Sequence, residues 1–138
     1  MTKAKMSSAQ LKRIEKALAS VPFARLLQLE LESVESGTAT LTLDVRKELT
    51  QNQGIVHGGA IASLIDTATA FAILSLIEPK DRITTVDLTI SYLRPVSKGR
   101  LRAVARVVRA GRRLFVVSAE VFAGEKLATT ALSTYIKL

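Results

Sequence analysis

Residues 51–66 read Gln51-Asn-Gln-Gly-Ile-Val-His57-Gly58-Gly59-Ala-Ile-Ala-Ser-Leu-Ile-Asp66, and they lead into a stretch that stays apolar to about Leu76. From Gly58 onward the segment is apolar on nearly every side, which predicts a buried helix rather than an amphipathic surface helix. Glu78-Pro79-Lys80-Asp81 predicts its end. Such a helix needs a second covering surface besides its own sheet, so we expect oligomerisation to supply it.

The same segment concentrates groups that perform chemistry. It contains the single histidine of the chain, its single Gly-Gly pair, and a carboxylate among apolar residues. Backbone N–H groups at a helix start have no intrahelical acceptor and can hold a developing oxyanion. A buried carboxylate such as that of Asp66 is costly without a partner or a purpose. The combination indicates an enzyme, and the alternative is an aspartate satisfied by Thr67, Thr69 or a neighbouring backbone group.

The segments on either side of this helix alternate with the period of strands. Strands are predicted at 27–31, 38–45, 83–93, 101–108, 114–122 and 127–136, with the first turn at Ser36-Gly37. A short helix over about residues 8–20 is predicted to be capped by Ser8 and ended by Pro22. This order predicts an α+β fold in which a long central helix packs on a curved antiparallel sheet of about five to six strands. Without repeats or linkers, we expect a single domain spanning residues 1–138.

Composition excludes several classes of protein. The chain has 138 residues, 48% of them apolar, but no apolar run long enough to span a bilayer. Its first residues lack the apolar core of a secretory signal, so we expect a cytoplasmic protein. The absence of cysteine removes disulfides, thiolate ligands and cysteine nucleophiles, and one histidine makes a protein-only zinc site improbable. We expect no metal and no cofactor.

The net charge of +8 raises the question of polyanionic partners. Many arginines fall late in the chain, at positions 94, 100, 102, 106, 109, 112 and 113. They lie among alternating apolar residues, and the chain has only four Phe and two Tyr and no nucleic-acid-binding motif. A solvated strand face or a site for small phosphorylated ligands therefore explains them better than nucleic acid does. We expect neither a nucleic-acid partner nor a membrane.

The motif Gly54-x-x-His57-Gly58-Gly59-x6-Asp66-x-Ala68, together with Pro22-Phe23, Thr84-Thr85-Val86-Asp87-Leu88 and Tyr92-Leu93-Arg94-Pro95, carries a family resemblance. It resembles the hotdog-fold acyl-CoA thioesterases of the phenylacetic-acid-degradation (PaaI-like) type. The likeness covers about residues 20–137. It implies a hydrolase that converts an acyl-CoA thioester to a free acid and CoA. A non-catalytic acyl-CoA-binding or regulatory hotdog domain is the main alternative.

By this resemblance, Asp66 is the catalytic carboxylate, acting as general base or as nucleophile. The backbone N–H of Gly58 polarises the thioester carbonyl. His57 helps to place the thioester or water, with an amide that is either Gln51 or Asn52. Gly59 is expected to contribute to substrate binding, as is Asn52 if Gln51 fills the amide role.

Thr85 matches a position where relatives have a hydroxyl near the reacting centre. Strand alternation predicts that it lies on the polar side of its strand, opposite Val86, Leu88 and Ile90. The other readings of the site residues are structural: His57 as a helix cap or core residue, the two glycines as a tight helix entry, and Gln51 and Asn52 as turn residues.

Helix geometry limits how these groups cooperate. Gly58 and Asp66 are eight residues apart, which is about 12 Å along a helix axis. One carbonyl held by a donor and attacked from the other side needs both groups within roughly 6–7 Å. We therefore predict a homodimer in which each site combines Gly58 of one chain with Asp66 of the other. Separately from this geometry, we expect two such dimers to form a dimer-of-dimers homotetramer. Apolar helix residues lining the pocket would suit medium or long aliphatic, or aromatic, acyl chains.

Overall fold

A computed structural model describes residues 5–138. Residues 1–4, on which the expected absence of a secretory signal partly rests, lie outside the described residues. The helices are α1 (Ser8–Ser20), α2 (Pro22–Leu27) and α3 (Gly58–Leu74), with a 3₁₀ turn at Lys47–Leu49. The strands are β1 (Glu30–Glu35), β2 (Thr38–Asp44), β3 (Ile83–Tyr92), β4 (Arg100–Ala110), β5 (Leu114–Ala123) and β6 (Lys126–Lys137). No helix among the described residues is long and apolar enough to cross a membrane.

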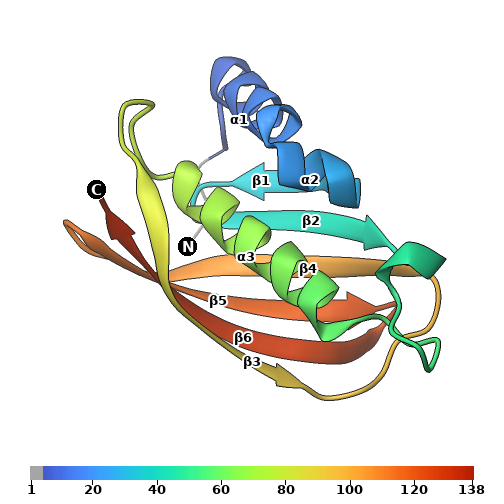
Figure 1. Cartoon of the computed structure of the whole chain (residues 1–138). Coiled ribbons are helices and arrows are strands. Elements are labelled where there is room, and N and C mark those ends of the chain that lie inside the picture. The colour runs from blue at the N-terminus through green and yellow to red at the C-terminus, as the bar shows by residue number, and fades with distance from the viewer. Residues whose placement is uncertain (1–4) are drawn as a thin grey trace.

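The described strands form one antiparallel sheet in the order β1-β2-β4-β5-β6-β3. Figure 1 shows the sheet curving behind α3, with α1 and α2 at the end where β1 lies. This arrangement confirms the predicted α+β hotdog architecture, with six strands in the described part of the chain. The two edges of the sheet are β1, which bears exposed glutamates and a register shift between Leu31 and Ser33, and β3.

The core lies between α3 and the concave face of the sheet. Its fully buried side chains include Leu64 and Ile65 of α3 and, from alternate positions of the strands, Leu41, Leu101 and Val121. One side of α3 is less well covered, because the side chains on it are only partly buried. These residues are Ala62, Ser63, Asp66, Thr67, Ala70 and Leu74. A single chain therefore leaves part of this apolar helix open, as the sequence led us to expect.

The N-terminal cap of α1 lies one residue before the predicted one. Ser7 Oγ accepts from Gln10 N at 3.1 Å, and Gln10 Oε1 accepts from Ser7 N at 2.8 Å. This reciprocal pair is a capping box, which satisfies two N–H groups that the helix leaves free. Ser8, the predicted cap, is instead the first helical residue.

The predicted strand at 27–31 is wrong at its start. Pro22 ends α1 as predicted but also begins α2, whose last residue is Leu27. Gln28 then adopts a left-handed conformation (φ 59°), and Leu29 N donates to Ala24 O at 2.9 Å, which closes the helix end. Proline suits the first turn of a helix because its missing N–H would have no partner there. The alternation of leucines therefore crosses a helix end and a turn before β1 begins.

Thr129, on the helix-facing side of β6, is the basis of a stability prediction. Its hydroxyl is buried and has no hydrogen-bond partner within residues 5–138. Thr129→Val keeps the shape and removes the unsatisfied group, so we expect stabilisation by about 1 kcal/mol. That corresponds to a rise in Tm of about 3 °C, measured by thermal unfolding at fixed protein concentration. A lower Tm would mean that the hydroxyl has a partner in the assembled protein.

Candidate active site

His57 caps the start of α3. Its backbone is extended (φ −63°, ψ 132°), and its Nδ1 accepts from Gly59 N at 2.8 Å. A neutral imidazole that accepts through Nδ1 carries its proton on Nε2. The side chain is exposed, so this Nε2–H can donate to a group in front of the helix. His57 thus has the capping role that the sequence offered as an alternative, and its Nε2–H has no acceptor within residues 5–138.

The two glycines at the helix start lie close to neighbouring side chains, and the approach is tighter at Gly59 than at Gly58. A Cβ on residue 59 would lie 2.9 Å from His57 Nδ1, and a Cβ on residue 58 would lie 3.2 Å from Tyr92 Cζ. Tyr92 also donates from Oη to Gly58 O at 2.7 Å. The Gly58 N–H belongs to the first turn, whose N–H groups have no intrahelical acceptor. The glycines can therefore allow close packing at the start of α3 while the Gly58 N–H remains available as a donor.

The preceding loop folds back on itself. Gln51 N donates to Ile55 O at 2.8 Å, and Gly54 N donates to Gln51 O at 3.0 Å. The side-chain carbonyl of Gln51 accepts from Gln53 N. Asn52 is exposed at the turn. Within the described residues, neither amide side chain hydrogen-bonds to His57 or Gly58, so the amide role stays a prediction for both.

Asp66 lies in α3, eight residues after Gly58, and is surrounded by hydroxyl groups. Thr85 Oγ1 donates to Asp66 Oδ1 at 2.8 Å, and Tyr135 Oη lies 3.0 Å from the same oxygen. Tyr135 Oη is also 2.6 Å from the main-chain O of Asp66 and 2.7 Å from Thr69 Oγ1. Asp66 itself is partly buried. The structure therefore joins the predicted residues Asp66 and Thr85, and adds Tyr135, which sequence reasoning missed.

A β-bulge brings Thr85 to Asp66. Along β3, Thr85 pairs with Tyr135 and Asp87 with Thr134, so Val86 is an extra residue without a partner. The bulge puts Thr85 on the helix-facing side together with Leu88 and Ile90, not opposite them as alternation predicts. Val86, 58% exposed, takes the outward position. A bulge of this kind re-aims a side chain, and bulges are frequent beside active sites.

No signal in the sequence identifies Tyr135, because its burial is seen only in the structure. It is 2% exposed in the last strand, and a buried tyrosine hydroxyl almost always has a hydrogen-bond partner. Burial, and to a smaller extent the charge of Asp66, raises the pKa of Tyr135 far above its ordinary value. The hydroxyl therefore stays protonated and acts as a donor.

The site residues form two groups on α3. The helix-start group comprises His57, Gly58, Gly59 and Tyr92, and the carboxylate group comprises Asp66, Thr69, Thr85 and Tyr135. Because Gly58 and Asp66 are eight residues apart in one helix, the two groups are separated by about 12 Å along its axis. β3 runs beside both groups, because Thr85 belongs to the carboxylate group and Tyr92 to the helix-start group.

Two of the late arginines are engaged on the outer face of the sheet. Arg100 binds Asp44 through two nitrogens at 2.7 and 3.0 Å, and Arg102 binds Glu32 at 2.7 Å. These hydrogen bonds hold the pKa of Asp44 and of Glu32 below their usual values. Arg94 donates from Nε to Leu127 O at 3.0 Å. The solvated-face reading therefore holds for Arg100 and Arg102.

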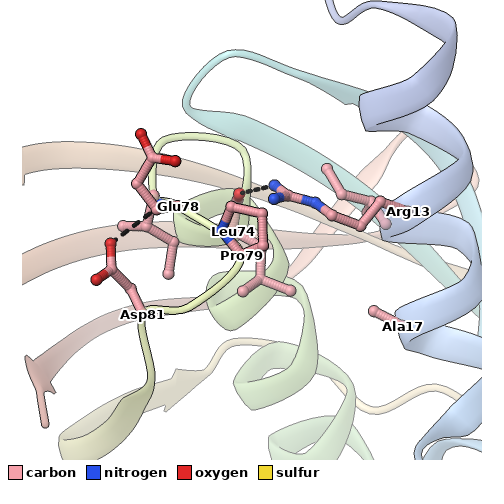
Figure 2. Close-up of a pocket in the computed structure, with 8 residues that line it drawn as sticks. Arg13, Ala17, Leu74, Glu78, Pro79 and Asp81 are labelled. Atoms are coloured by element: carbon pink, nitrogen blue, oxygen red, sulfur yellow. Dashed lines mark hydrogen bonds between the residues drawn. The ribbon is translucent and has the colours of Figure 1, made fainter.

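A cavity of about 230 Å³ lies between α1 and the segment that follows α3. Figure 2 shows Arg13 reaching across it to the carbonyl of Leu74, at 3.4 Å, and Glu78 and Asp81 closing the opposite side. None of the residues of the two site groups lines it. Among residues 5–138 no cluster of His, Asp or Glu is suited to hold a metal ion.

Comparison with known proteins agrees with this fold. A family model described as the thioesterase superfamily matches residues 53–129, more than half of the chain. The chain is 32% identical over 132 residues to the medium/long-chain acyl-CoA thioesterase YigI of Salmonella typhimurium, covering 84% of this chain and 85% of that protein.

Two solved structures share the whole architecture. A thioesterase family protein from Silicibacter pomeroyi superposes with a TM-score of 0.89 at 27% identity, over 94% of this chain and 98% of that one. A mutant of the phenylacetic acid degradation protein PaaI from Thermus thermophilus gives 0.80 at 28% identity, over 86% and 100%. With its helix-and-sheet fold and the matching family model, the chain belongs to the thioesterase superfamily and is a hotdog-fold enzyme that hydrolyses thioesters.

Proposed function

We propose that the protein is an acyl-CoA thioesterase that converts medium-chain, long-chain or aromatic acyl-CoA to the free acid and CoA. The observation that carries this proposal is the Asp66 carboxylate, held by Thr85 in the same helix whose first turn offers the Gly58 N–H. The similarity to YigI, a medium/long-chain acyl-CoA thioesterase, supports the substrate class.

In this reaction Asp66 acts as general base on water or as nucleophile, and the Gly58 N–H stabilises the negative charge that develops on the carbonyl oxygen. The carbonyl carbon gains an oxygen that comes from water, the C–S bond breaks, and CoA leaves as a thiolate. Because a thiolate departs readily, a base and an oxyanion donor suffice. His57 Nε2–H and the amide of Gln51 or Asn52 help to orient the thioester, and Gly59 lies at its binding site.

Each site is shared between two chains, because one chain keeps its two groups too far apart for one carbonyl. β3 is an edge strand that touches both groups. If two β3 strands pair antiparallel about a point between Leu88 and Thr89, Thr85 of one chain stands opposite Tyr92 of the partner subunit. Asp66 of the first chain then faces Gly58 of the partner subunit, and the second site forms by symmetry.

Exposed apolar side chains on two surfaces, the β3 edge and the outer face of the sheet, support two subunit interfaces. On β3, Val86 and Tyr92 are exposed, and the partly buried side of α3 carries small residues such as Ala62 and Ala70 that allow close approach. On the outer face of the sheet, Val108, Leu114 and Leu132 are at least half exposed. The first surface would form the dimer, and the second would join two dimers into a homotetramer.

The test is an assay of CoA thiol release over a panel of saturated acyl-CoAs of increasing length and an aromatic acyl-CoA, with Asp66→Asn as the matched control. We expect kcat/KM to rise at least tenfold from acetyl-CoA to medium-chain acyl-CoA, because each buried methylene contributes about 0.8 kcal/mol. If neither the wild type nor Asp66→Asn released CoA faster than uncatalysed hydrolysis on any substrate, the protein would be an acyl-CoA-binding domain instead.

A further inference from the structure

The hydroxyl of Tyr135 contacts both the main chain and the carboxylate of Asp66. Its Oη lies 2.6 Å from the main-chain O of Asp66 and 3.0 Å from Oδ1, while Thr69 Oγ1 lies 2.7 Å away on the other side. The ring is buried, at 2% exposure, between α3 and β6. No other described residue binds both the backbone and the side chain of the carboxylate residue from a different element.

The direction of these hydrogen bonds follows from the number of protons. A main-chain O and a carboxylate oxygen only accept, and two oxygens 2.6 Å apart repel unless a hydrogen lies between them. The single Tyr135 proton is therefore shared between the main-chain O of Asp66, at 2.6 Å, and Oδ1, at 3.0 Å. Thr69 Oγ1, which also lies 2.9 Å from Ile65 O, is then the group that can donate to Tyr135 Oη. The chain runs from Thr69 to Tyr135 to Asp66.

These bonds treat the two carboxylate oxygens differently. Oδ1 receives both Thr85 and Tyr135, whereas Oδ2 has no hydrogen-bond partner within residues 5–138. Oδ2 is therefore the carboxylate oxygen left available. Asp66 lies on the partly buried side of α3 that also carries Ala62 and Ala70.

We propose that Tyr135 is a positioning residue of the thioesterase reaction: with Thr85 it fixes Asp66 through Oδ1, so that Oδ2 is the oxygen that meets water or the thioester. This inference rests on the proposed function, because it concerns the same carboxylate. Tyr135 acts through Asp66 and does not touch the substrate. Its hydroxyl sets the orientation of the reacting oxygen.

The test is Tyr135→Phe, assayed on the best acyl-CoA of the panel. Phenylalanine fills the same space, and Thr69 keeps Ile65 O as an acceptor, so no buried group loses its last partner. We expect kcat to fall about 10- to 100-fold, the effect of losing a hydrogen bond to a charged group. KM should stay within about twofold and Tm within about 3 °C, because ground-state binding and packing are preserved.

The matched control is Thr129→Val, which removes another buried hydroxyl from the helix-facing side of the same strand. It should leave kcat within about twofold. A double-mutant cycle with Thr85→Val adds a second measurement. Because both donors hold one oxygen, the double variant should lose at least about fivefold less than the product of the two single losses.

The outcomes separate the two proposals. If Asp66→Asn is inactive and the wild type active, but Tyr135→Phe keeps its kcat, the positioning role is overturned and the thioesterase function stands. A fall in kcat with a matching rise in KM or drop in Tm would also overturn it, by assigning Tyr135 a purely structural role. A wild type that releases CoA no faster than uncatalysed hydrolysis would overturn the function and this inference together, whereas an active wild type matched by Asp66→Asn would overturn this inference alone.

Discussion

Asp66→Asn is expected to lower kcat on acyl-CoA by about a thousandfold, the range found when a positioned acid–base group is removed. Asparagine keeps the size of the side chain, and its carbonyl oxygen can still accept from Thr85 and Tyr135. What it loses is the negative charge and with it the ability to take a proton from water or to attack a carbonyl. The measurement is thiol release at saturating substrate.

The control for Asp66→Asn is its stability and its affinity for a non-hydrolysable acyl-CoA analogue. Both should stay near those of the wild type, because the partly buried position and its hydrogen-bond partners are retained. A variant that folds, binds the analogue and hydrolyses at the wild-type rate would remove Asp66 from the mechanism. Weak activity caused by unfolding would instead appear as a lowered Tm.

Mixed dimers of two inactive variants are expected to regain up to about half of the wild-type rate, because one of their two sites is intact. The first variant is Asp66→Asn. The second is Gly58→Pro, which removes the proposed oxyanion donor and should cost about 10²–10³ in kcat. Proline is tolerated at the first helical position, and the extended backbone of His57 permits a following proline. Co-expression with two different tags and purification through both isolates the mixed species.

Two controls make the mixed-dimer result decisive. Gly58→Ala keeps the N–H and adds only a Cβ that meets the Tyr92 ring, so it should retain more activity than Gly58→Pro. Co-expression of Asp66→Asn with Asp66→Ala should give no recovery, since every site then lacks the carboxylate. Mixed dimers as inactive as their parents would place both groups of a site in one chain.

The sequence predicted the long helix and the strands that follow it because their patterns have long, uninterrupted periods. The sequence-based prediction failed where a single residue interrupts the alternation of a strand. The leucines at 27, 29 and 31 keep a period of two while Leu27 is helical and Gln28 is left-handed. Likewise, a single extra residue, Val86, reverses the face on which Thr85 lies.

The candidate site was predictable to the extent that its groups lie close together in the sequence. His57, Gly58 and Asp66 belong to one segment, and their separation along the helix follows from its rise per residue. Tyr135 is 69 residues from Asp66, and nothing in its own strand indicates which acceptor its hydroxyl meets. Contacts of that kind depend on strand register, which alternation alone does not define.

The difference between the two sheet edges limits how these chains assemble. Along β1, the exposed glutamates 30, 32 and 35 and the register shift after Leu31 discourage another strand from pairing. Along β3, Asp87 is the one charged residue in the strand Ile83–Tyr92. A sheet with one blocked edge and one open edge accepts a single neighbour by strand pairing. In the dimer proposed above, strand pairing would therefore stop at two chains, because no second open edge is left to extend the sheet into a fibre.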